Sequence, residues 1–310
     1  MHAASALGIV GERPVGALID SGRPTSCGAA SRHFSSVPVP ASPIPLSGIR
    51  TPLFKLHRKC ARRARRRSLI RCSTYCVPPA VKPPWTIPAV VRHIADTLDA
   101  HGVPEAVVVG HSLGGVVAVE YARANPGRAR AAVNLDGFWW GREYPGADRV
   151  SEGLLASAGT IAPPECIEEK VVNSARFGIP ADRAAATARA AARPLPDGTW
   201  QTLPERAEAL EIFDELNRIF ALGVTPWLDE VDFPLLLVQA GRQLPPAPGM
   251  EWFGEFSARF AQGVSEELAT LTRTRPTITV NRIDATHLMN METPEAVATL
   301  VAGFVRGLPG

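Results

Sequence analysis

The sequence has no apolar run that approaches the roughly 18 residues a membrane-spanning helix requires. Residues 1–18 also lack the charged start and the continuous apolar stretch of a secretory signal. We therefore expect no membrane span and a cytoplasmic location.

Cysteine is scarce as well, with only five among 310 residues. An odd number of cysteines in a chain of this length argues against a disulfide-stabilised scaffold. Cys60, Cys72 and Cys76 can be drawn around a zinc ion with His57, but their spacing matches no zinc-binding pattern closely. We expect unpaired thiols in a reducing compartment and no metal site.

Acidic residues are almost absent from residues 1–84, which hold 14 Lys and Arg but only two Asp and Glu. Residues 85–310 hold 19 basic and 28 acidic residues, so the two parts carry opposite net charge. The basic run at residues 58–71 has no interleaved aromatic side chains, which favours solvated disorder over nucleic-acid binding. We interpret residues 1–84 as an atypical N-terminal segment, largely disordered, basic and proline-rich over residues 27–84.

Regular secondary structure is predicted from Trp85 onward. Residues 87–101 carry apolar side chains at helical spacing. Two short apolar runs, at residues 106–109 and 130–135, have the composition of buried parallel strands, and residues 116–124 between them predict a helix. Strand, helix and strand joined by tight turns form the βαβ unit of a parallel sheet.

Helical patterns dominate the next segment, in which we find no clear strand. The chain is thus predicted to be α/β, with a mostly parallel sheet flanked by helices built from residues 85–140 and 231–310, and residues 141–230 inserted as a helical cap. The elements expected after residue 140 are helices near 166–177, 181–193 and 204–221, strands at 235–239 and 277–282, and a closing helix near 294–306.

The strongest functional signal is the pentapeptide Gly110-His111-Ser112-Leu113-Gly114, which fits the G-x-S-x-G pattern between a strand and a helix. Side chains two positions before and after the serine would collide with the neighbouring strand and helix, so Gly110 and Gly114 make the cramped turn possible. Ser112 then projects at a helix N-terminus, where the dipole favours negative charge and the Leu113 N–H can donate to an oxyanion. A glycine-rich turn without chemistry is the alternative, which the flanking strand and helix disfavour.

With this motif, residues 85–310 resemble an α/β-hydrolase that carries a helical cap after its sixth strand. The resemblance implies a Ser–acid–His triad in that chain order, an oxyanion hole, and hydrolysis of esters or related acyl compounds without a cofactor. The partner it implies is a small-molecule acyl substrate, which we expect to be apolar.

A serine hydroxyl needs a base, because it is barely ionised at neutral pH. His287 is the histidine that follows the motif, and it lies between a predicted strand and the last helix, where it resembles the family's catalytic histidine. A capping or surface histidine is the alternative. His111 is adjacent to Ser112, so its side chain should point elsewhere.

The acid of the triad has more than one candidate. Many members of the family carry it after the strand that corresponds to residues 235–239, but no carboxylate follows that strand before Glu251. Other members carry it one strand earlier, where Asp136 precedes Gly137. We favour Asp136 over Glu251 and Asp284, while a plain turn aspartate remains an alternative role for it.

A second oxyanion donor is expected from a loop near the N-terminus. Residues 15–26 predict a strand and a loop similar to the family's His-Gly-x loop, with Ser21 in place of the histidine. The resemblance makes the N–H of Arg23 the donor.

Four aromatic residues flank the predicted cap and either line an acyl pocket or pack the cap on the core: Trp139, Trp140, Phe220 and Trp227.

Residues 24–84 depart from the family pattern, because they offer only Ser68–Cys76 as a weak strand where the fold needs an apolar one. Three functions therefore stay open. The first is an active serine hydrolase that works through an acyl-enzyme. The second is an impaired hydrolase-fold protein with a damaged N-terminal core. The third is another chemistry on the same triad, such as C–C hydrolysis, perhydrolysis or acyl transfer.

Overall fold

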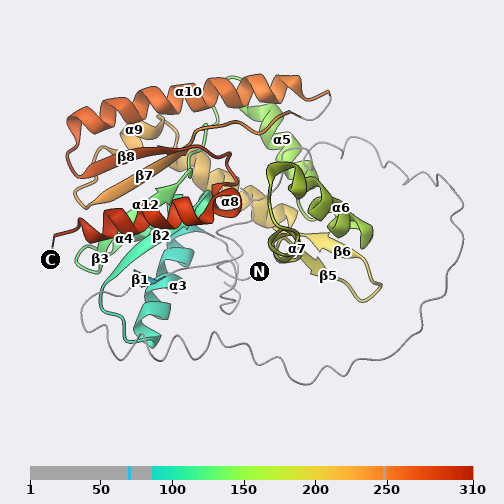
Figure 1. Cartoon of the computed structure of the whole chain (residues 1–310), viewed down its shortest axis with the longest axis horizontal. Helices are drawn as coiled ribbons and strands as arrows, with labels where there is room; N and C mark the ends of the chain where they lie inside the picture. The colour runs from blue at the N-terminus through green and yellow to red at the C-terminus, as the bar shows by residue number, and fades with distance from the viewer. Residues whose placement is uncertain (1–68, 71–85, 247–248, 310) are drawn as a thin grey trace, which may run out of the picture.

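The computed structural model describes residues 69–70, 86–246 and 249–309. Within them, a five-stranded sheet has the order β1-β2-β3-β7-β8, and every neighbouring pair is parallel (Figure 1). The strands are β1 (Leu69–Ile70), β2 (Ala106–His111), β3 (Ala129–Leu135), β7 (Leu235–Ala240) and β8 (Ile278–Ile283).

Both faces of the sheet are covered, as the apolar strand sequences require. Along β7, Leu235 and Leu237 point into one apolar cluster, whereas Leu236 and Val238 point into another, and all four are fully buried. The first cluster packs under α3 (Ile87–Ala100), α4 (Leu113–Ala124), α8 (Arg206–Ile219), α9 (Val224–Leu228) and α10 (Glu251–Thr274). The second packs under α12 (Pro294–Arg306), which crosses in front of the sheet in Figure 1.

The parallel register brings the carboxyl ends of the strands together. His111 pairs with Leu135, Leu135 with Val238, and Ala240 with Ile283. The segments that follow β2, β3, β7 and β8 therefore lie at one edge of the sheet, where α/β proteins place their ligand sites.

The predicted fold class is confirmed, and the expected helices and strands after residue 85 are present with ends shifted by a few residues. The largest shift in the core is at α4, which begins at Leu113 instead of residue 116. Of the weak strand expected over Ser68–Cys76, the structure describes Leu69–Ile70, paired with β2.

The expectation of no strand within residues 141–230 is wrong. Three short strands, β4 (Ile161–Ala162), β5 (Ala192–Pro194) and β6 (Trp200–Thr202), form an antiparallel sheet in the order β4-β6-β5. Strands of two or three residues carry no readable alternation of apolar and polar positions. The turn between β5 and β6 does carry a signal, because Asp197 accepts the Thr199 N–H at 2.9 Å, as aspartate commonly does in turns.

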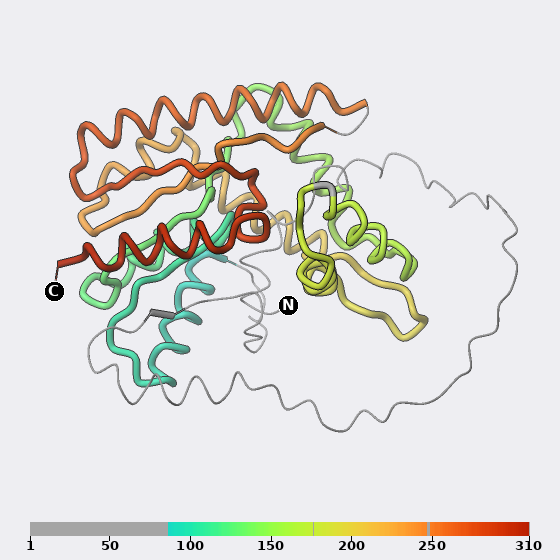
Figure 2. Tube along the Cα trace, viewed as in Figure 1, coloured from blue at the N-terminus to red at the C-terminus, as the bar shows by residue number. Residues whose placement is uncertain are grey.

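The inserted segment also contains α5 (Ala147–Ser157), α6 (Glu165–Ser174), η3 (Ala175–Phe177) and α7 (Ala181–Ala190). Figures 1 and 2 show α6, α7, β5 and β6 grouped beside one end of the parallel sheet. In contrast, α8 buries Ile212 and Leu216 in the apolar cluster it shares with α4 and α10. No helix in the described part of the chain is both long and apolar enough to cross a membrane.

Candidate active site

Ser112 occupies the tight turn between β2 and α4. Its backbone has φ 56° and ψ −128°, a conformation that costs free energy for a non-glycine residue and is seldom kept without a functional reason. The turn is held by two hydrogen bonds: the Ser112 N–H donates to Leu135 O at 2.9 Å, and the Gly115 N–H donates to Ser112 O at 2.8 Å.

Gly110 is required by the close approach of the first turn of α4. A Cβ at this position would lie 1.8 Å from the Gly114 carbonyl oxygen, far inside contact distance and against backbone that cannot rotate away. Gly115 is similarly constrained, since a Cβ there would lie 2.4 Å from Asn134 Oδ1. The structure therefore supports the prediction that a side chain at Gly110 would collide with its neighbours. It shows the same constraint at Gly115, which the sequence argument did not name.

Leu113 is the first residue of α4, so the helix itself supplies no acceptor for its N–H. The positive end of the helix dipole lies at the same point. If Ser112 Oγ attacked a carbonyl carbon, the oxyanion formed on that carbon would meet both a hydrogen-bond donor and a favourable field.

Asp136 follows β3 directly and also has positive φ, 55°. Its N–H donates to Val238 O at 2.7 Å, and its Oδ1 accepts the Ala240 N–H at 2.9 Å, so β7 fixes both its backbone and its side chain. Its Oδ2 accepts the Nδ1–H of His287 at 2.7 Å. Burial alone raises the pKa of Asp136, but the hydrogen bonds from His287 and Ala240 outweigh it, and the pKa lies below its usual value.

Asn134 is a residue of this site that the sequence prediction misses. It is fully buried within β3, where it donates to Gly137 O at 2.9 Å and accepts the Gly137 N–H at 2.6 Å. These two bonds close the turn that carries Asp136. The available signal is an amide residue within an otherwise apolar strand, because buried polar side chains are retained where they have partners.

A buried carboxylate, Glu292 in α11 (Met289–Glu292), organises the segment that carries His287. Its side chain is 4% exposed, and it accepts both the N–H and the hydroxyl of Thr286. Thr286 Oγ1 in turn accepts the Leu288 N–H at 3.2 Å. Arg242 balances the charge of Glu292 at 3.0 Å. Sequence reasoning gave Glu292 no role.

His111 points away from Ser112, as expected, and its Nε2–H donates to the carbonyl oxygen of His287 at 2.6 Å. The two imidazole rings lie 4.8 Å apart. Burial, together with the neighbouring His287 ring, lowers the pKa of His111 to about 3. His111 is therefore neutral across the physiological pH range and supports the backbone of His287.

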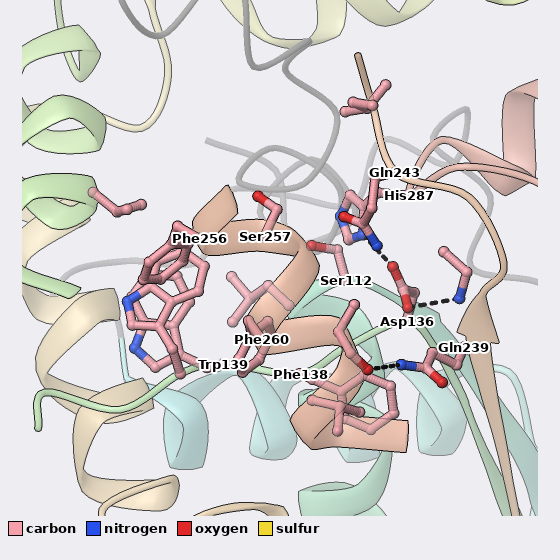
Figure 3. Close-up of a pocket in the computed structure, with 18 of the residues that line it drawn as sticks. Ser112, Asp136, Phe138, Trp139, Gln239, Gln243, Phe256, Ser257, Phe260 and His287 are labelled. Atoms are coloured by element: carbon pink, nitrogen blue, oxygen red, sulfur yellow. Dashed lines mark hydrogen bonds and ion pairs between the residues drawn. The ribbon is translucent and has the colours of Figure 1, made fainter. Parts of the chain in front are cut away.

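Ser112, Asp136 and His287 line one cavity of about 190 Å³ (Figure 3). The structure thus brings together the three residues named from the sequence. Among the described residues, Ser112 and Asp136 are the two non-glycine positions with positive φ. Within the described part of the chain, Ser112 Oγ and His287 are not joined by a hydrogen bond. Hydrogen bonds between catalytic groups are often long or poorly aligned before substrate binds.

The rival acids lie elsewhere. Glu251 begins α10, and its carboxylate accepts the Gly249 N–H at 3.1 Å. The side chain of Asp284 is 91% exposed and pairs with Arg242 at 3.0 Å. Of the three carboxylates considered, Asp136 is the one bonded to His287.

The four aromatic residues named from the sequence separate into two pairs. Trp139 and Trp140 line the cavity and stack with ring centroids 4.0 Å apart. Phe220, at the end of α8, and Trp227, in α9, are buried in the core with centroids 4.6 Å apart and are not among the residues that line the cavity. Helix α10, which the sequence prediction does not include, also contributes to the wall of the cavity.

The loop at residues 15–26, with its proposed donor Arg23, lies outside the described residues, as do Cys27, Cys60, Cys72 and Cys76. Within the described ranges, no cluster of three or more His, Cys, Asp or Glu side chains is arranged to hold a metal ion.

A family model described as the alpha/beta hydrolase family matches residues 54–300. The chain belongs to this family. The predicted resemblance is thereby confirmed, and with it membership of a hydrolase family.

Two curated proteins share local similarity with this chain. Lipase LipV of Mycobacterium tuberculosis is 38% identical over 91 residues, which are 29% of this chain and 34% of LipV. The putative carbamate hydrolase RutD of Azorhizobium caulinodans is 41% identical over 55 residues, which are 18% of this chain and 21% of RutD. The alignments thus span about a third or less of these relatives.

Among solved structures, E-2-(acetamidomethylene)succinate hydrolase superposes with a TM-score of 0.53 at 20% identity, over 75% of this chain and 78% of that protein. At this identity, the likeness concerns the fold alone.

Replacing Gly110 by alanine should strongly destabilise this hydrolase, because the new Cβ would meet the Gly114 carbonyl oxygen at 1.8 Å. We expect a loss of about 3 kcal/mol or more in the free energy of unfolding, measured by urea denaturation. Gly153→Ala in α5 is the control, since its Cβ would meet nothing within 4 Å and should stabilise the helix by roughly 0.5–1 kcal/mol. Equal stability of the two variants would contradict the turn geometry.

The free energy of unfolding should fall as the pH drops from 6.5 toward about 3. The upper limit is the ordinary pKa of histidine, and the lower limit is the pKa of His111 in the folded protein. In this window the unfolded chain binds a proton at His111 that the folded chain does not, so the loss approaches about 1.4 kcal/mol per pH unit. His111→Gln keeps an N–H donor for His287 but does not titrate, so unfolding measured between pH 4 and 6.5 should show a shallower slope. Parallel slopes would mean that His111 is protonated in the fold.

Proposed function

We propose that this chain is a serine hydrolase that cleaves an ester or a related acyl compound through an acyl-enzyme intermediate. Ser112 is the nucleophile, His287 the general base and Asp136 the acid that supports it. The observation that carries the proposal is the 2.7 Å hydrogen bond from His287 to Asp136, formed in the wall of the cavity that Ser112 also lines. The strained backbone conformation of Ser112 also supports the proposal.

The hydrogen bond to Asp136 fixes the proton of His287 on Nδ1, so that Nε2 carries the lone pair that accepts a proton. In the first step, Ser112 Oγ attacks the acyl carbon as Nε2 takes the hydroxyl proton. Because the pKa of Asp136 is lowered, its carboxylate is ionised at neutral pH and stabilises the imidazolium that forms.

The tetrahedral intermediate places a negative oxygen next to the N-terminus of α4. We assign the Leu113 N–H as one donor to this oxyanion, and Arg23 is retained as the proposed second donor. Collapse of the intermediate expels the leaving group, which takes the proton from His287 Nε2. A water molecule then repeats the sequence on the acyl-enzyme, releasing the carboxylic acid and restoring Ser112. The proposed cycle uses no cofactor.

A fluorophosphonate probe should label the wild-type protein at Ser112, detected by mass spectrometry of the intact chain and its peptides. Ser112→Ala should lose the label and at least about a thousandfold of its kcat on p-nitrophenyl esters. Ser257→Ala is the matched control, because Ser257 lines the same cavity from α10 and should leave labelling unchanged.

Labelling of the Ser112→Ala variant would disprove the nucleophile assignment. Absence of labelling in the folded wild-type protein would favour the alternative of an impaired hydrolase-fold protein.

Asp136→Asn should lower kcat by several orders of magnitude, about ten-thousandfold, because an amide can hold the imidazole in the wrong tautomer. Glu251→Gln should change kcat less than about twofold, since its carboxylate contacts a loop N–H and not His287. Steady-state kinetics of the two variants, with circular dichroism as the check on folding, decides between them. The reverse ranking would move the acid to Glu251.

A further inference from the structure

We propose that the cavity binds the acyl part of the substrate, and not the alcohol part, and that this acyl group is uncharged and apolar. The inference rests on the proposed function, because it uses the roles of Ser112 and His287 to orient the substrate.

The orientation follows from proton transfer. The leaving oxygen must receive its proton from His287 Nε2, so the alcohol part lies on the His287 side of the reacting carbon. In Figure 3, Ser112 lies between His287 on one side and Phe256 and Trp139 on the other. The space lined by Phe256 and Trp139 is therefore left for the acyl group.

The wall on that side is apolar apart from Ser257 of α10, which Figure 3 shows beside Phe256. It is contributed by Leu113 and Val116 of α4, Val150 and Leu154 of α5, and Phe256 and Phe260 of α10. Burial of hydrocarbon against such a surface is favourable in proportion to the area removed from water.

The far part of this wall is a packed aromatic cluster. The Trp140 ring stacks on Trp139 and meets Phe256 and Phe260 edge to face, with centroids 5.2 and 5.8 Å away. Such mutually packed rings form a fixed surface that limits the size of the acyl group.

One polar side chain of the lining, Gln239, is already paired. Gln239 donates to Ala261 O at 2.7 Å and accepts the Ser265 hydroxyl at 2.8 Å, so its amide is directed into α10. A hydroxylated or amide-bearing acyl group would therefore gain no hydrogen bond from Gln239 in return for those it loses to water.

The charged groups of the lining also exclude a carboxylate. Arg242, the cationic side chain of the described lining, forms ion pairs with Asp284 and Glu292, each at 3.0 Å. Asp136 adds a negative charge to the same lining. An acyl carboxylate would therefore lose its hydration without gaining a free cation.

Two ester series test the orientation. With p-nitrophenol as the fixed alcohol, kcat/KM should rise roughly threefold per methylene from acetate through butyrate, until the acyl group fills the cavity. With butyrate as the fixed acyl group, methyl to butyl alcohols should change kcat/KM less than about threefold in total. The p-nitrophenyl hemiester of succinic acid, which matches butyrate in chain length, should react at least a hundredfold more slowly than p-nitrophenyl butyrate.

Leu154→Trp should narrow the cavity and lower the hexanoate-to-acetate ratio of kcat/KM at least tenfold. Ala156→Trp is the matched control, because it places the same side chain at an exposed position of the same helix. Fluorophosphonate labelling of Ser112 confirms that each variant is folded. If Leu154→Trp does not fold, the two ester series on the wild-type protein decide the question.

A steep dependence on the alcohol, a preference for the hemiester, or an unchanged ratio in labelled Leu154→Trp would overturn this inference while leaving the serine hydrolase intact. Failure of the probe to label the wild-type protein, with no ester turned over, would overturn both.

Discussion

The arrangement of the site depends on the hydrogen bond between His287 and Asp136, which joins segments 151 residues apart in the sequence. Neither side chain could keep this position alone. The parallel pairing of β3 with β7 fixes Asp136 through Val238 O and the Ala240 N–H, and β7 pairs in turn with β8, which leads to His287. Register in this sheet therefore determines the geometry of this hydrogen-bonded pair, because a shift by one residue would turn the carboxylate to the other face.

The same pair sets the electrostatic character of its surroundings. A buried carboxylate is costly unless donors surround it, and here a ring N–H and a backbone N–H supply them. In the proposed mechanism His111 must stay neutral, because a second cation 4.8 Å from His287 would oppose formation of the His287 imidazolium. Burial keeps it neutral, and its remaining role is a hydrogen bond to the His287 backbone.

The sequence was sufficient to predict the sheet and the turn at Ser112, and it named Asp136, the carboxylate that hydrogen-bonds to His287. Each of these depends on local patterns or chain order. It was insufficient for Asn134 and Glu292, whose partners are defined by the folded turn. It was also insufficient for β4, β5 and β6, which are too short to show an alternation of apolar and polar residues. For α10, Phe256, Phe260, Val264 and Leu268 recur at helical spacing, so the helix itself was predictable. Its position as a cavity wall was not, because that depends on packing between distant segments.

Helix α10 connects the fold to the selectivity proposed for the site. It packs on the sheet through Val264, Leu268 and Leu271, which fixes its N-terminal half above the cavity. From there it presents Phe256 and Phe260 to the acyl side and pairs with the amide of Gln239. The polar groups needed for proton transfer are thus confined to one side of Ser112 and the apolar surface to the other. An ester with a hydrocarbon acyl group fits this arrangement, because its alcohol part lies near the groups that transfer protons and its acyl chain lies against the apolar surface. The reverse orientation would place each part of the substrate against the wrong surface.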